Sequence, residues 1–147
     1  MILVLQTVIF PRFSFYGVMP DLVLVSVIAF AVFNERTPAT VFSGAAGFLQ
    51  DILSAGPYLN TVIKVLVCSV VGMAKERFMG DEYPMLAALV AIFTPLIVLA
   101  QWLMLYFLFG KHLDCSRLFF FILAGTLYNI LMVPILVPAV RWVSRGD

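Results

Sequence analysis

The chain has 147 residues, of which 63% are hydrophobic and only 12% are charged, whereas soluble domains carry about 25% charged residues. This composition predicts an integral membrane protein. The net charge of +1 is too small, and the nine Lys and Arg residues are too scattered, for the chain to bind nucleic acid.

The first apolar run, residues 1–10, is short for a membrane span, because ten helical residues rise only about 15 Å against a hydrocarbon core of ~30 Å. It lacks the basic start and the small-residue cleavage site of a secretory signal peptide. Two explanations stay open. Either the first helix continues past Pro11 and Arg12 to about residue 15, or the native start lies upstream of Met1, which we favour.

Six helices in one transmembrane domain, residues 1–147, are predicted from the apolar runs and from the Pro, Gly and charged residues between them. The expected ranges are about 1–15, 21–33, 39–53, 59–74, 86–109 and 118–140. The fifth run is long enough, at about 36 Å, to span a membrane with some tilt, and Pro95 is expected to kink it.

Six passes place both termini on the same side of the membrane. The links on that side contain Arg36, Lys75, Arg77, Arg141 and Arg145, and the opposite links contain Arg12, Lys111 and Arg117. Cytoplasmic links usually carry the excess of Lys and Arg, so both termini are expected in the cytoplasm.

The third predicted helix carries a stripe of small residues, Ser43, Gly44 and Gly47, at helical spacing with Asp51. In a membrane such a stripe lets two helix backbones approach closely. Asp51 is therefore expected to face the bundle and not the lipid. A carboxylate at this depth is a functional-site hypothesis by default.

Four polar side chains are expected in the extracytoplasmic half of the bundle: Asp21, Asp51, Lys64 and Gln101. The turn after Asp51 joins two antiparallel helices, so Asp51 and Lys64 lie at similar depth and could form an ion pair. Asn129 is expected deeper. Three interpretations stay open: a structural pair, a functional pocket, or a Lys64 side chain that snorkels to the membrane surface.

Catalysis finds little support in the sequence. His112 is the only histidine and lies in a link, while Cys68 and Cys115 show neither metal-ligand spacing nor the context for a mutual disulfide. Asp21 with Asp51 is the only carboxylate pair within the apolar segments that an aspartyl mechanism could use. We therefore expect no enzyme, no cofactor and no bound metal.

Three stretches resemble the rod-shape-determining protein MreD family: Leu5-Gln6-Thr7 with Phe10-Pro11-Arg12, the stretch Gly17 to Leu22, and the stretch Gly44 to Pro57. The resemblance covers most of the chain, and its specific motifs lie in the first sixty residues. The last two helices match in length and hydropathy.

The resemblance implies a non-catalytic scaffold in the bacterial inner membrane, within the cell-elongation complex that builds lateral peptidoglycan. It implies a fold similar to the substrate-binding subunits of energy-coupling-factor transporters. The implied partners are MreC, the polymerase RodA and a class B penicillin-binding protein. The resemblance also implies that six motif positions shape the helix packing on which a partner docks: Pro20, Asp21, Gly44, Gly47, Asp51 and Gly56.

The alternative function is a membrane protein that binds a small molecule or a lipid headgroup, resembling a transporter substrate subunit. It requires an enclosed pocket of a few hundred cubic ångströms, the usual size of such sites. The side chains expected to point into this pocket are Asp21, Asp51, Lys64 and Gln101.

Overall fold

The computed structural model describes residues 17–54, 59–77, 81–110 and 114–144, apart from the side chain of Phe109. Over these ranges the fold is all-α, as expected from the sequence. The elements are α2 (Leu22–Phe33), α3 (Arg36–Ser54), α4 (Leu59–Ala74), the short 3-10 helix η3 (Lys75–Arg77), α5 (Glu82–Phe109) and α6 (Cys115–Ser144). The first expected helix, at about 1–15, lies outside the described residues.

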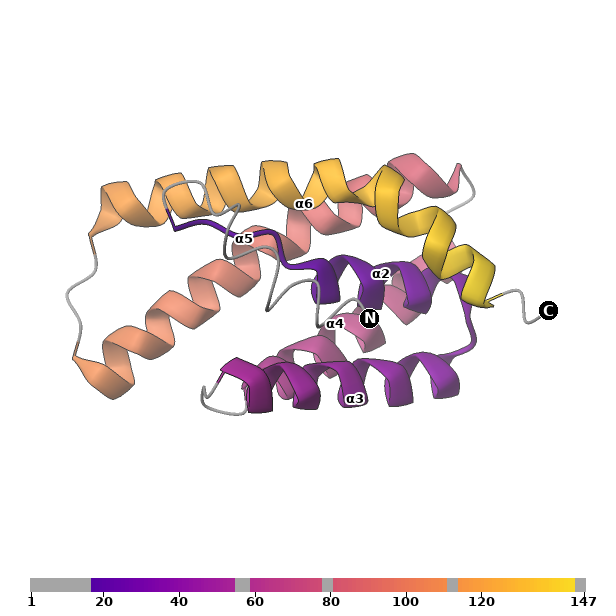
Figure 1. Cartoon of the computed structure of the whole chain (residues 1–147), viewed down its shortest axis with the longest axis horizontal. Helices are drawn as coiled ribbons and strands as arrows, with labels where there is room; N and C mark the ends of the chain where they lie inside the picture. The colour runs from indigo at the N-terminus through magenta and orange to yellow at the C-terminus, as the bar shows by residue number, and fades with distance from the viewer. Residues whose placement is uncertain (1–16, 55–58, 78–80, 111–113, 145–147) are drawn as a thin grey trace.

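Helix α2 lies at the centre of the bundle and contacts each of the other four described α-helices. In Figure 1 it runs between α6 on one side and α3 on the other. Helices α3 and α4 pack together as a hairpin. Helices α5 and α6 form a second pair, whose members separate toward the link that joins them. Two helix pairs therefore surround one short central helix.

The sequence of α2 explains its central place, because apolar residues cover it on every side. Residues 22–29 and Ala31 are all buried, and a helix that is apolar all round is stable only inside a protein or a membrane. Its one polar residue, Ser26, donates its hydroxyl to the Leu22 carbonyl oxygen at 2.7 Å. With 12 residues, α2 rises about 18 Å, well short of a ~30 Å hydrocarbon core.

Helices α5 and α6 are, by length and composition, the two described helices that are suited to cross a membrane. They have 28 and 30 residues, and the most apolar stretch of each has a mean hydropathy of 2.2. Only 22% of that stretch is buried in either helix, so most of its side chains face outward. Helices of this length rise about 42–45 Å, enough to span a tilted path through a bilayer.

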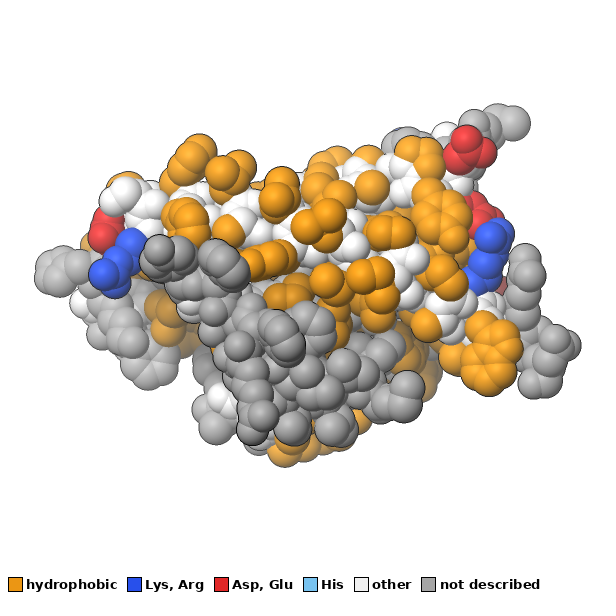
Figure 2. Space-filling view, turned by 45° about the horizontal axis from the view of Figure 1, so that its top comes forward, with side chains coloured by type: hydrophobic (Ala, Val, Ile, Leu, Met, Phe, Trp, Pro, Cys, Tyr) orange, Lys and Arg blue, Asp and Glu red, His pale blue; other side chains and the backbone are white. Residues whose placement is uncertain are grey.

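Large apolar side chains cover much of the outer surface of the described chain. Those that α3 and α4 expose include Val41, Phe48, Ile52, Val62, Leu66, Val70 and Met73. In Figure 2, hydrophobic side chains fill the middle of the visible face and the charged ones lie near its two ends. A soluble monomer rarely exposes so large an apolar surface, whereas a bilayer would cover it.

Three helices begin earlier than expected, at Arg36 (α3), Glu82 (α5) and Cys115 (α6). Pro38 and Pro84 lie in the first turns of α3 and α5, where the missing N–H costs no intrahelical bond. Helix α6 also continues to Ser144 through Pro134 and Pro138. Its ribbon changes direction in this C-terminal part, which is the usual effect of proline within a helix.

Candidate functional site

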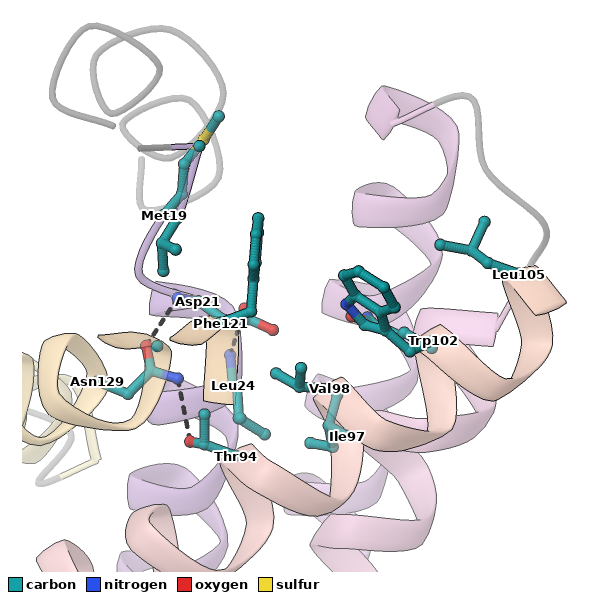
Figure 3. A pocket seen from close by; sticks show the side chains of 14 residues that line it. Met19, Asp21, Leu24, Thr94, Ile97, Val98, Trp102, Leu105, Phe121 and Asn129 are labelled. Atoms are coloured by element: carbon teal, nitrogen blue, oxygen red, sulfur yellow. Dashed lines mark hydrogen bonds between the residues drawn. The ribbon is translucent and has the colours of Figure 1, made fainter. Parts of the chain in front are cut away.

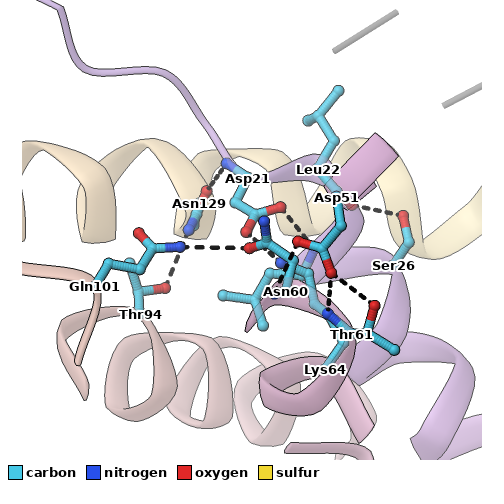
Figure 4. A network of polar contacts seen from close by, with 11 residues as sticks. Asp21, Leu22, Ser26, Asp51, Asn60, Thr61, Lys64, Thr94, Gln101 and Asn129 are labelled. Atoms are coloured by element: carbon cyan, nitrogen blue, oxygen red, sulfur yellow. Dashed lines mark hydrogen bonds and ion pairs between the residues drawn. The ribbon is translucent and has the colours of Figure 1, made fainter. Parts of the chain in front are cut away.

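The start of α2 is built around Asp21, which follows the buried Pro20. Its Oδ1 atom accepts a hydrogen bond from the Leu24 N–H at 3.0 Å, so Asp21 is the N-cap of the helix. Its backbone N–H donates to Oδ1 of Asn129 in α6 at 2.8 Å. The Asn129 amide in turn donates to Oγ1 of Thr94 in α5 at 3.1 Å. These contacts join α2, α5 and α6 at one depth (Figure 4).

The buried cation of the bundle, Lys64 on α4, pairs with Asp21. The Lys64 Nζ and the Asp21 Oδ2 are 2.7 Å apart, and the Lys64 side chain is 0% exposed against 21% for Asp21. A buried ammonium needs such a partner, because its desolvation is otherwise very costly. Of the interpretations left open by the sequence, the ion pair between Asp51 and Lys64 is not formed, and Lys64 does not snorkel to the surface.

Asp51 is only 1% exposed and caps the N-terminus of α4 from the neighbouring helix. Its Oδ1 accepts the Asn60 N–H at 3.0 Å, and its Oδ2 accepts the Thr61 N–H at 2.8 Å and the Thr61 hydroxyl at 2.6 Å. The first N–H groups of a helix have no partner within the helix, and a carboxylate there also meets the positive end of the helix dipole. Asp51 thus fastens α4 to α3.

Gly47 lies one turn before Asp51 and allows the same two helices to meet. A Cβ atom at Gly47 would lie 2.6 Å from the Thr61 Cα and 2.9 Å from the Asn60 carbonyl oxygen, so any side chain there would displace the α4 backbone. At Gly44 the nearest atom to such a Cβ is the Val65 Cγ2, at 3.7 Å, which is an ordinary contact. Of the two glycines, only Gly47 is required by the packing. Gly56 lies outside the described residues.

A cavity of about 270 Å³ lies beside the Asp21–Asn129–Thr94 network. Its lining residues come from the segment before α2, from α5 and from α6: Gly17, Val18, Met19, Asp21, Leu24, Thr94, Ile97, Val98, Gln101, Trp102, Leu105, Phe121, Gly125 and Asn129. Figure 3 shows Met19 and Asp21 on one side of it, with Trp102 and Leu105 on the other. Two of the four side chains expected in a pocket, Asp21 and Gln101, are in this wall.

The other two side chains lie elsewhere, because each is turned toward a neighbouring helix. Lys64 lies on the buried stripe of α4 with Val67, Cys68 and Val71, and Asp51 lies against the first turn of α4. Neither is among the residues that line the cavity. Gln101 connects the two regions through a long hydrogen bond of 3.4 Å from its Nε2 to the Asn60 Oδ1.

The sequence matches the family of rod shape-determining proteins MreD over residues 1–145, almost its whole length. The chain belongs to the MreD family. No curated protein and no solved structure matches it. Members of the MreD family are non-catalytic membrane proteins that determine rod shape, so the chain has a role in cell shape and is not an enzyme.

A second polar cluster of this MreD family member lies at the other end of α2. The Lys75 ammonium donates to the carbonyl oxygens of Ala31, at 3.0 Å, and of Asn34, and so neutralises the negative end of the helix dipole. The Asn34 amide donates to the Ser144 hydroxyl at 2.8 Å. Here α2 is held by η3, which follows α4, and by the end of α6.

Arg141 links α6 to the start of α5 near this second cluster. Its Nη2 lies 2.5 Å from the Glu82 Oε2, and its guanidinium carbon lies 5.5 Å from the centre of the Phe33 ring. At the opposite end of α6, the Ser116 hydroxyl donates to the Asp114 Oδ1 at 2.7 Å. This hydrogen bond is the largest cause that lowers the pKa of the exposed Asp114 carboxyl below its usual value.

Metal ligands and nucleophiles do not form a further site in the ranges that the structure describes. No three His, Cys, Asp or Glu residues gather there in a group that could hold a metal ion. Cys68 is buried and Cys115 is exposed, and both are free thiols. His112 lies outside those ranges.

Three residues complete the polar network but were not predicted as site residues: Asn60, Thr61 and Thr94. Asn60 and Thr61 directly precede the apolar run of α4, a position in which polar residues commonly mark a helix N-terminus. That signal could have suggested an N-terminal capping site for Asp51. Thr94 gives no comparable signal, because it is a lone hydroxyl within a long apolar helix.

Proposed function

We propose that the chain is a non-catalytic scaffold of the bacterial cell-elongation complex in the inner membrane. In this role it binds MreC and supports lateral peptidoglycan synthesis, with RodA and a class B penicillin-binding protein in the same complex. Membership of the MreD family carries the proposal. It is supported by the way Asp51, Lys64 and Asn129 hydrogen-bond within the bundle, since polar groups used in this way stabilise helix packing.

The proposed topology has six passes, with a first helix at about 1–15, in a bundle similar to the substrate-binding subunits of energy-coupling-factor transporters. Both termini are placed in the cytoplasm. The lengths of α5 and α6 support two of these passes, and the cluster in which Lys75 and Arg141 lie near the C-terminal end of α2 supports the placement of the termini. Basic residues concentrated at one end of a bundle favour a cytoplasmic location for that end.

The outward face of the α3–α4 hairpin is the proposed contact surface for the transmembrane segment of MreC. Phe48 on α3 and Leu66 on α4 are 49% and 59% exposed, and both lie away from the buried stripes of their helices. Transmembrane helices associate mainly through van der Waals packing, so a partner helix needs a well-fixed apolar surface. The Gly47 and Asp51 contacts fix the two helices that present it.

Co-purification from bacterial membranes tests this surface. We expect the double variant Phe48→Ala and Leu66→Ala to recover about tenfold less MreC than the unchanged chain, because two large contact side chains are lost. The matched control truncates two equally outward residues of α6, Leu131→Ala and Ile135→Ala, which are 55% and 63% exposed. Equal recovery of MreC by both double variants would show that the hairpin is not the contact surface.

The second candidate function, binding of a small molecule or lipid headgroup, is favoured by one observation, the cavity beside Asp21 and Gln101. The cavity is smaller than most drug-sized sites, which start at about 300 Å³. It lacks the Asp51 and Lys64 side chains that the sequence had suggested. This candidate therefore requires a small ligand group that two polar side chains and the aromatic wall can recognise.

A further inference from the structure

We propose that the cavity between the segment before α2, α5 and α6 binds an uncharged, hydroxyl-rich group, such as the sugar or glycerol headgroup of a membrane lipid. The inference deepens the second candidate function and is independent of MreC binding. Three features of the wall carry it: its balanced charge, its polar side chains beside aromatic rings, and its open, apolar rim.

Among the residues that the structure describes, the charges at the wall are balanced. The Asp21 carboxylate faces the cavity, and the Lys64 ammonium lies directly behind it at 2.7 Å, fully buried. A cationic headgroup would meet the repulsion of this ammonium, and an anionic one would meet the carboxylate first. Either ion would also lose its hydration without gaining an unpaired counter-ion. An uncharged ligand avoids both costs.

The polar groups in the wall suit hydroxyls. Carboxylate oxygens accept hydrogen bonds, while a Gln side chain both donates and accepts, so Asp21 and Gln101 together can serve hydroxyl groups in either direction. The Gln101 amide has only a long hydrogen bond, 3.4 Å, to Asn60, which a better partner could replace. The buried Asn129 amide already makes two hydrogen bonds, from the Asp21 N–H at 2.8 Å and to the Thr94 Oγ1 at 3.1 Å. These bonds hold the wall in place.

Aromatic rings form a further part of the wall. The Trp102 and Phe121 rings meet edge to face with their centres 5.9 Å apart, and both line the cavity. Such rings offer an apolar surface to the C–H groups of a sugar or glycerol unit, and the indole adds an N–H donor. A wall that combines hydrogen-bond acceptors with aromatic rings matches a molecule that has both hydroxyls and C–H faces.

The cavity is open toward the apolar exterior. Two of its lining residues, Met19 and Leu105, are 44% and 39% exposed, so part of its wall reaches the surface. Its lining residues Leu105 and Phe121 belong to the parts of α5 and α6 nearest to the link between them, beside exposed apolar side chains that would contact lipid tails. A volume of about 270 Å³ accommodates a headgroup and leaves the acyl chains outside.

Fluorescence of Trp102 provides the test. The chain has two tryptophans, and Trp142 is 76% exposed at the far end of α6, so the variant Trp142→Phe leaves Trp102 as the sole reporter. The full chain is placed in phosphatidylcholine nanodiscs. It is titrated with glucosyl-diacylglycerol, with soluble methyl glucoside, and with phosphatidylethanolamine, a zwitterionic lipid whose headgroup carries charges in place of sugar hydroxyls.

We expect a saturable change in Trp102 emission with glucosyl-diacylglycerol. Gln101→Leu should raise the concentration for half-saturation about tenfold, the usual effect of one lost hydrogen bond. Gly125→Leu should abolish the change by filling the cavity, because the first carbon added there meets only ordinary contacts at 3.9 Å. The control Leu123→Ala, on the outward side of α6, should behave as the unchanged chain.

Each remaining outcome decides the question. A response to methyl glucoside alone supports the site and assigns it a soluble ligand. No saturable response to either glucoside, a stronger response to phosphatidylethanolamine, or full binding by Gln101→Leu overturns the inference. If Gly125→Leu does not yield monodisperse protein, Gln101→Leu decides, since that side chain makes only one weak contact. None of these results depends on whether MreC co-purifies.

Discussion

Two carboxylates within the apolar bundle, Asp21 and Asp51, are held by different kinds of partner. Asp21 pairs with the buried cation Lys64 and caps its own helix, α2. Asp51 is held by the N–H groups and the hydroxyl at the start of α4, the helix that follows its own. The first arrangement joins three helix neighbours to α2, and the second joins only α3 to α4. The two acids therefore serve helix packing in two separate ways.

Removal of the buried cation should have the largest effect on stability. Lys64→Met leaves the Asp21 carboxylate without its close counter-ion. We expect a loss of about 2–4 kcal/mol in the free energy of unfolding. This loss is slightly smaller than for a fully buried pair, because Asp21 is partly exposed. Denaturant unfolding of the purified chain in detergent measures this loss.

The matched control for that variant is Lys64→Met combined with Asp21→Asn. The Asn oxygen can still accept the Leu24 N–H, and no uncompensated charge remains, so the double variant should recover at least half of the lost stability. If the single Lys64→Met variant is as stable as the unchanged chain, the Asp21–Lys64 pair contributes nothing to the free energy of unfolding.

A second prediction concerns the close contact of α3 with α4. Gly47→Ala places a methyl group 2.6 Å from the Thr61 Cα, so the helices must separate, and we expect a loss of about 2–3 kcal/mol. Gly44→Ala, three residues away on the same helix, adds the same methyl with no close contact and should change stability by less than about 0.5 kcal/mol. Equal effects of the two substitutions would mean that the backbone approach at Gly47 is not required.

The smallest effect is expected at the Asp51 cap. Asp51→Ala leaves the Asn60 and Thr61 donors without their acceptor and should cost about 1–2 kcal/mol, the usual cost of a lost N-cap. Asp51→Asn keeps one acceptor oxygen and should cost about half as much. Thermal unfolding of the two variants side by side measures the difference, and an Asn variant less stable than the Ala variant would argue against a capping role.

Sequence reasoning predicted the all-α class and the membrane character, and the resemblance to MreD is confirmed over almost the whole chain. It also placed Asp51 on a face turned into the bundle. The helix starts were less predictable, because Pro38 and Pro84 were read as breaks although a first turn tolerates proline.

The partners within the polar network could not be derived from the sequence. Helical rise fixes the depth of Asp51 and Lys64, but which neighbour each side chain meets depends on the rotation of each helix about its axis. The structure turns Lys64 toward α2 and Asp51 toward the end of α4. The partner role of Asn129 depends on α6 packing beside the start of α2, more than 100 residues away in the chain.

Recovery of MreC with the Asp51→Asn variant tests most directly whether the polar network supports the fold while the outer face binds the partner. We expect as much MreC to co-purify from bacterial membranes with Asp51→Asn as with the unchanged chain. The Phe48→Ala and Leu66→Ala double variant should lose most of the co-purifying MreC. Loss of MreC with a folded Asp51→Asn variant, together with full recovery by the double variant, would contradict the account.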